Sequence, residues 1–198
     1  MAKKGKKGGV SLIVSIICLV LSVLLITTFF MPTFTEGADE KVSYNGVTLT
    51  QAMFMSEDDA EEAALNAVNA LKYNEDERAD YARLVAAYEY AHDEDNAGFA
   101  TTIVLNWFVL LVGVVGTVLS VLNLLGKDLS KALIGVSAVG VVLTIVVAIL
   151  ATGYAKYVYD EVLVKDWATL AAGAGVWVAL ASSVLTLGTA VTGKILKK

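Results

Sequence analysis

The chain is poor in the side chains that most enzymes and metal sites use. Its 198 residues include one histidine, one cysteine and one proline. Zinc sites draw their ligands mainly from cysteine and histidine, so His92 and Cys18 give no basis for one. Cys18 also has no second cysteine with which to form an intramolecular disulfide. The single proline excludes a long proline-rich linker.

Motifs for catalysis or phosphate binding are missing as well. His92 has no nucleophile motif to accompany it. The acidic run at 92–96 lacks the alternating ligand spacing of a calcium loop. Gly5, Gly8 and Gly9 lie in a lysine-rich tail with no preceding strand, so they do not indicate a phosphate-binding loop. We therefore expect no enzyme activity, no catalytic or cofactor-binding residues and no metal site.

Charge is absent from four long apolar stretches, although the chain as a whole is 18% charged and 57% hydrophobic. A helix needs about 20 apolar residues to cross the hydrocarbon core of a bilayer. The sequence therefore predicts four membrane spans, at 10–31, 102–125, 132–152 and 168–190. A charge inside the membrane usually marks an ion or proton pathway. Its absence argues against a proton-coupled transporter.

The charges outside these spans are segregated by sign. The segments 1–9, 126–131 and 191–198 together carry +8, whereas 32–101 carries −12 and 153–167 carries −1. Short loops rich in lysine stay in the cytoplasm. We expect a multi-pass plasma-membrane protein with both termini inside and the acidic segment outside. The first apolar stretch is too long for a signal peptide, so we expect it to be retained.

The basic tails have a simple explanation. Lysines beside the inner leaflet attract anionic lipid head groups. Anionic lipids are thus the expected partners of the tails, and no nucleic acid is expected.

The acidic segment 32–101 is predicted to be a small α+β domain between the first two spans. Asn45-Gly46 lies between two runs that favour strands, and such a pair favours a tight turn with positive φ. We therefore predict a β-hairpin over 41–50, followed by a helical hairpin over 57–92. The fold class is an all-α membrane protein, a four-helix bundle carrying this extracytoplasmic domain.

Capping patterns mark both helices of the helical hairpin. Ser56 with Asp59, and Asn74 with Glu77, match the spacing of a capping box. Each helix also has an apolar stripe at helical spacing. The predicted stripes are Ala60, Ala64, Val68 and Leu71 in the first helix, and Tyr81, Leu84, Val85, Tyr88 and Ala91 in the second.

Two features of the remaining chain are open to more than one interpretation. The segment 154–164 fits either a strand that pairs with the 41–50 hairpin or an extension of the third span. Its tyrosines and Trp167 suit the membrane interface. Small residues in the spans, such as Gly113, Gly116, Gly173 and Gly175, favour close helix packing. A homo-oligomer seam or a pore lining would also use them.

This layout resembles that of the claudin and peripheral-myelin tetraspan family. Four spans, internal termini, a large first outer loop with a hairpin and a smaller second loop are common to both. The claudin signature of tryptophans and cysteines in the first loop is absent, as is the Cys-Cys-Gly motif of tetraspanins. The resemblance therefore implies an architecture and transfers no functional residue.

Together these features favour a non-enzymatic membrane protein whose acidic outer domain mediates interaction with a protein or an envelope component, or self-association. The alternative is a subunit of a channel or transport complex. An acidic vestibule that concentrates cations would support that alternative. The partner, the oligomeric state and any conducted ion lie beyond what the sequence indicates.

Overall fold

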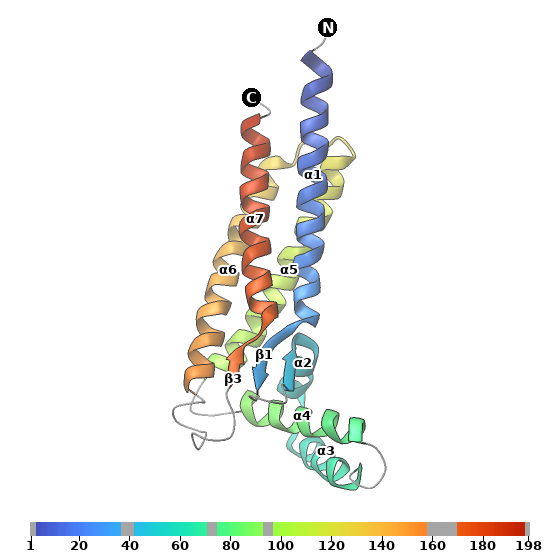
Figure 1. Ribbon diagram of the computed structural model, residues 1–198, viewed down its shortest axis with the longest axis vertical. Coiled ribbons are helices and arrows are strands. Elements are labelled where there is room, and N and C mark those ends of the chain that lie inside the picture. The colour runs from blue at the N-terminus through green and yellow to red at the C-terminus, as the bar shows by residue number, and fades with distance from the viewer. Residues whose placement is uncertain (1–2, 37–41, 71–74, 93–96, 158–169, 197–198) are drawn as a thin grey trace. The chain divides into compact units, whose positions relative to one another are not determined.

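The computed structural model describes residues 3–36, 42–70, 75–92, 97–157 and 170–196. Most of these residues are helical, and a small three-stranded sheet accompanies the helices (Figure 1). The elements in chain order are α1 (Lys3–Thr27), a short 3-10 helix (Thr28–Phe30), β1 (Pro32–Glu36), β2 (Val42–Asn45), α2 (Gly46–Phe54), α3 (Glu57–Ala70), α4 (Glu75–Ala91), α5 (Gly98–Leu124), α6 (Ser130–Tyr157), β3 (Leu170–Ala172) and α7 (Ala174–Leu196).

Four helices are long and apolar enough to cross a membrane, as the sequence predicts. They are Leu12–Phe30, Gly98–Leu124, Ser130–Ala155 and Ala174–Leu196. The chain divides into two compact units. The bundle unit comprises Met1–Phe29, Leu105–Ala148 and Gly175–Lys198, and the sheet unit comprises Phe30–Val104 and Ile149–Ala174.

Small residues bring the helices of the bundle unit close together. A side chain at Gly113 or Gly116 of α5 would meet α1, since an added Cβ at Gly116 would lie 2.8 Å from the Ser22 hydroxyl. On α6, an added Cβ at Gly140 would lie 2.9 Å from Val112 of α5. An added side chain at these contacts would force a neighbouring group to shift, so glycine favours the close packing of the helices.

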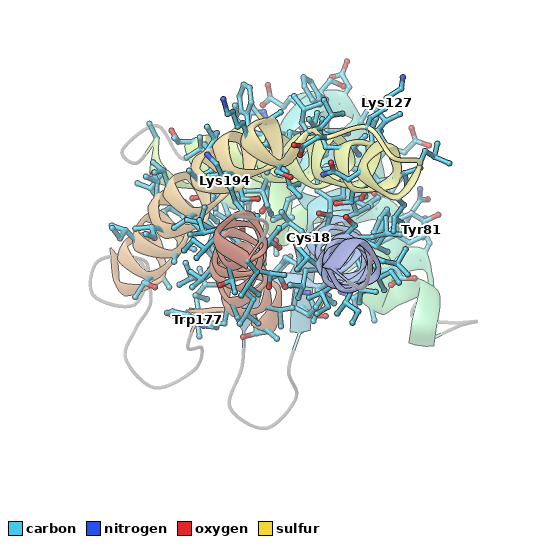
Figure 2. The ribbon with its side chains drawn as sticks, turned by 90° about the horizontal axis from the view of Figure 1, so that it is seen from above. Cys18, Tyr81, Lys127, Trp177 and Lys194 are labelled. Atoms are coloured by element: carbon cyan, nitrogen blue, oxygen red, sulfur yellow. The ribbon has the colours of Figure 1, made fainter. Side chains whose placement is uncertain are left out.

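The remaining contacts close the ring of four helices. Gly140 also faces Ser183 of α7, and the Cys18 thiol of α1 lies 4.0 Å from the Thr186 carbonyl oxygen of α7. Figure 2, which looks down on the molecule, shows Cys18 between these two helices. Figure 1 shows the beginning of α1 and the end of α7 at the same end of the bundle unit.

Buried and exposed side chains of the bundle unit differ in polarity in the sense expected of a membrane bundle. Its outward positions carry large apolar side chains, among them Val20, Leu111, Val142 and Leu185. Its interior is rich in small hydroxyl side chains, several of which donate to the carbonyl four residues earlier in the same helix. The buried hydroxyl residues are Ser15, Ser22, Thr28, Ser120, Ser137, Thr144, Ser182, Ser183 and Thr186.

A tight turn joins α5 to α6. Gly126 has φ of +91°, a conformation that favours glycine. The Gly126 and Lys127 amides donate to the carbonyls of Asn123 and Leu122, which is the hydrogen-bonding pattern of a Schellman cap. The Asn123 side chain then accepts from the Leu129 amide at 2.8 Å. The carbonyls of Leu122 and Asn123 near the end of α5 are thereby satisfied within a short connection.

The sheet has the order β2-β1-β3, and both pairs are antiparallel. The predicted hairpin over 41–50 is wrong, because Gly46 begins α2 and Gly126 is the positive-φ residue among those described. Asn45 has extended backbone angles and caps α2, accepting from the Val47 and Thr48 amides at 3.0 Å each. An asparagine before a glycine suits a helix N-cap as well as a turn.

The fourth span begins later than predicted. Leu170–Ala172 form β3, which pairs with β1 with Phe34 opposite Ala172. Gly173 links this strand to α7, so it is not a helix-packing residue of the span. Its amide donates to the Thr33 carbonyl at 2.7 Å. On α6, the helix extends to Tyr157, so 154–157 are helical. These four residues agree with the interpretation of 154–164 as an extension of the third span, and the remainder, 158–164, lies outside the described residues.

The predicted helical hairpin is confirmed as α3 and α4, which pack together. At the start of α3, the Ser56 hydroxyl accepts from the Asp59 amide at 3.2 Å, and the Asp59 carboxylate accepts from the Ser56 amide at 3.3 Å. This is the predicted capping box. Asn74 lies outside the described residues.

The capping box yields a prediction about pH. Hydrogen bonds from the Ser56 hydroxyl and then from its amide lower the pKa of Asp59 below its ordinary value. Because the pKa of Asp59 is lower in the folded protein than in the unfolded chain, its ionised carboxylate stabilises α3 at pH values above the unfolded pKa of about 4. This stabilisation is lost as the pH falls through the folded pKa. Ser56→Ala should cost about 1 kcal/mol near neutral pH. Hydrogen exchange of the first amides of α3 measures both effects, and an unchanged pH dependence in Ser56→Ala would contradict the assignment.

Aromatic rings from five elements form the core of the sheet unit. Phe34 of β1 and Phe99 of α5 stack with ring centroids 4.9 Å apart, and Tyr154 of α6 lies 4.9 Å from Phe99. Tyr44 of β2 and Tyr90 of α4 meet edge to face at 6.1 Å. The Tyr154 hydroxyl donates to the Tyr90 carbonyl at 3.4 Å. Tyr154 is thus a core residue of the sheet unit and not an interface anchor.

Candidate functional site: the outer face of helix α3

The packing of α3 against α4 determines which residues α3 leaves exposed. Ala60 and Ala63 are buried, one helical turn apart, and Ala87 of α4 is fully buried. Alanine lets the two helices approach closely, so the small side chains take the inner positions. The longer Leu65 and Val68 are left outside, with 63% and 61% of their surfaces exposed.

The predicted stripes are therefore only partly correct. Ala60 is buried as expected, but Val68 is exposed, and Leu71 lies outside the described residues. On α4, Tyr81 is exposed whereas the unpredicted Ala87 is buried. A closer signal was present in the alanines at 60, 63 and 67, which recur at helical spacing.

Exposed carboxylates flank the apolar pair on α3. Glu61 and Glu62 precede Leu65 by four and three residues, which places them on the same helix face. Both are exposed. We call Glu61, Glu62, Leu65 and Val68 the outer face of α3. It presents two adjacent apolar side chains beside a patch of negative charge.

The charges of the outer face remain uncompensated among the residues that the structure describes. Within that part of the chain, the ion pair observed is Arg83 with Asp80 on α4, at 3.1 Å. Further carboxylates precede the outer face in the first turn of α3, where the helix dipole favours them. The described residues of the outer face therefore include two exposed carboxylates, Glu61 and Glu62.

A second exposed apolar side chain lies shortly before α3. Phe54, at the end of α2, has 78% of its surface exposed, more than any other large apolar side chain described in the sheet unit. Soluble surfaces scatter apolar side chains singly, so Phe54 alone indicates little. It adds to the apolar area of the sheet unit without being assigned to the outer face.

His92, the histidine considered above, contacts Tyr88 and does not indicate a reaction centre in the described part of the chain. The His92 ring lies 4.2 Å from the Tyr88 ring, and its Nδ1 is 3.0 Å from the Tyr88 carbonyl oxygen. Residues 93–96 lie outside the described residues. Trp107 packs on Phe29 at 4.9 Å, and Trp177 is half exposed at the periphery of the bundle unit (Figure 2).

Metal-binding side chains are also dispersed. Across residues 3–36, 42–70, 75–92, 97–157 and 170–196, no three His, Cys, Asp or Glu side chains gather closely enough to hold an ion. No protein-family model, curated protein or solved structure matches this chain.

Proposed function

We propose that this chain is a non-enzymatic membrane protein whose sheet unit binds a protein partner through the outer face of α3. The observation that carries the proposal is the exposure of Leu65 and Val68 beside Glu61 and Glu62. An apolar helix face laid into a groove is a recurring mode of protein recognition. Apolar anchors surrounded by charge also fit the usual anatomy of an interface, an apolar core inside a polar rim.

The charge identifies the kind of partner. The segment 32–101, which contains α3, has a net charge of −12. Two copies of this surface would repel each other, since like charges across an interface disfavour association. A partner with an apolar groove rimmed by lysine or arginine would instead be attracted. We therefore assign the outer face to a basic-rimmed protein surface rather than to self-association.

The proposal includes an orientation, with both termini cytoplasmic and the sheet unit outside. Its support is the distribution of lysine, which favours the cytoplasmic side for short loops. The lysine-rich tails would then meet anionic lipid head groups of the inner leaflet.

Cysteine labelling tests the orientation. Ala97→Cys should react with a membrane-impermeant maleimide in intact cells, whereas Lys127→Cys should react only after permeabilisation. Both positions are exposed, and the native Cys18 is buried, so it contributes little background. Labelling of Lys127→Cys alone in intact cells would reverse the proposed orientation.

Photo-crosslinking tests the binding face. A benzophenone amino acid at Leu65, in the full-length chain in its native membrane, should crosslink to a protein whose modified residue lies in an apolar surface next to lysine or arginine. The same probe at Ala82, an exposed position on α4, provides the matched control. The yield should fall at high ionic strength, because salt screens the attraction between exposed charges.

A charge-reversed variant sharpens the test. Glu61→Lys combined with Glu62→Lys should reduce the Leu65 crosslink severalfold without altering the melting temperature of the purified protein, because both side chains are exposed. Equal crosslinking from Leu65 and Ala82, or crosslinks from Leu65 to lipid or to a second copy of the chain alone, would contradict the proposal.

The channel-subunit hypothesis stays a prediction, and conductance of the purified protein in a planar bilayer tests it.

A further inference from the structure

The bundle unit contains a small, partly open cavity, and hydroxyl groups form part of its lining. Ser22 of α1, Ser137 of α6, and Ser183 and Thr186 of α7 contribute to its wall. Gly116 and Gly140 also line the cavity, and their lack of side chains leaves space between the helices. An added Cβ at Gly140 would lie 3.7 Å from the Ser183 hydroxyl oxygen.

Ser183 is the unexplained group in this cavity. Only 2% of its surface is exposed, and its hydroxyl has no hydrogen-bond partner among the residues that the structure describes. Buried hydroxyls are almost always hydrogen-bonded, to protein or to ordered water. The neighbouring hydroxyls of Ser137 and Thr186 donate to carbonyls of their own helices at 2.7 Å each. Their oxygens can still accept a further hydrogen bond.

We propose that this cavity binds one water molecule, which hydrogen-bonds to Ser183 and links it to hydroxyls of the neighbouring helices. The cavity offers about 10 Å³ to the centre of a water-sized sphere, which is the space that a single water needs. The hydroxyls supply the two to four polar partners that such a water requires. The inference rests on the bundle unit alone and is independent of the outer face of α3.

The lining residues favour water over a cation as the bound species. No carboxylate is among the lining residues, and hard cations in proteins take about six or more oxygen ligands. Four hydroxyl oxygens fall short of such a coordination shell. A neutral molecule that both donates and accepts hydrogen bonds suits the site, because Ser183 can do both.

A crystal structure of the full-length protein in a lipid phase, at a resolution that shows ordered water, tests the proposal. One density peak should lie within about 3.2 Å of the Ser183 hydroxyl oxygen. Ser183→Val should abolish this peak, because its methyl groups fill the space without offering a hydrogen bond. Ser182→Val is the matched control and should retain the peak, since Ser182 is equally buried but does not line the cavity.

Several results would overturn the proposal. Density missing from the wild-type cavity would do so without any variant, as would a peak that persists in Ser183→Val. Crystals soaked in rubidium salt provide the cation arm, because rubidium gives an anomalous signal that water lacks. An anomalous peak beside Ser183 would show an ion site in place of the water.

Discussion

Replacing Phe34 with alanine is expected to lower the free energy of unfolding of the sheet unit by about 3–5 kcal/mol. Phe34 is fully buried. It stacks on Phe99 and meets the edge of Tyr154, with centroids 4.9 and 6.1 Å away. Truncation would remove this aromatic contact and leave a cavity among rings that come from separate elements, so local repacking cannot refill it.

Thermal unfolding of the purified protein in detergent, followed by near-ultraviolet circular dichroism, measures the effect of Phe34→Ala. Faster trypsin cleavage within the sheet unit should accompany it. Phe54→Ala is the control, because Phe54 is 78% exposed and surface substitutions usually change stability by less than about 0.5 kcal/mol. Equal losses in the two variants would show that the ring cluster is not the core of this unit.

Gly173→Ala should lower the free energy of unfolding of the sheet unit by about 2–3 kcal/mol. A Cβ at this position would overlap the carbonyl oxygen and carbon of Pro32. Those atoms belong to the backbone of β1 and are held by the sheet, so they cannot move aside as a flexible side chain could. The strand pair β1–β3 would have to open, with loss of the hydrogen bond from Gly173 to Thr33.

Gly153→Ala is the matched control for Gly173→Ala. Gly153 lies on α6 in the same unit, and an added Cβ there meets nothing within 4 Å. Alanine should be neutral or stabilising at that position, because it favours helix by about 1 kcal/mol over glycine. The two variants are compared by their melting temperatures in detergent. A Gly173→Ala protein as stable as Gly153→Ala would exclude the close approach between β3 and β1.

The elements predicted correctly are those whose signals are local. Four uncharged apolar runs identified the four long helices, and the Ser56–Asp59 spacing identified the start of α3. Asn45-Gly46 was misassigned because the same two residues suit a tight turn and a helix N-cap. What decides between them is the burial of Leu49 and Ala52 on α2, which depends on tertiary packing.

Other features could not be predicted because their cause lies far away in the chain. In the sequence, Leu170–Ala172 look like the start of an apolar span. They form a strand because they pair with β1. Tyrosine is a residue type that suits a membrane interface, but the Tyr154 ring packs against Phe34 and Phe99. The outer face of α3 was missed for a similar reason. Val68 was grouped with Ala60, but the buried side of α3 is formed by Ala60 and Ala63 and leaves Val68 exposed.

The position of β1 at the centre of the sheet has a consequence for synthesis of the chain. β1 follows the first span directly, whereas its partner β3 immediately precedes the last. While the ribosome is still making α5 and α6, one edge of β1 has no strand to pair with, and such an edge can template pairing with other chains. Nascent chains arrested before residue 170 should therefore need chaperones to stay unaggregated. They should also be degraded faster than chains long enough for β3 to have left the ribosome.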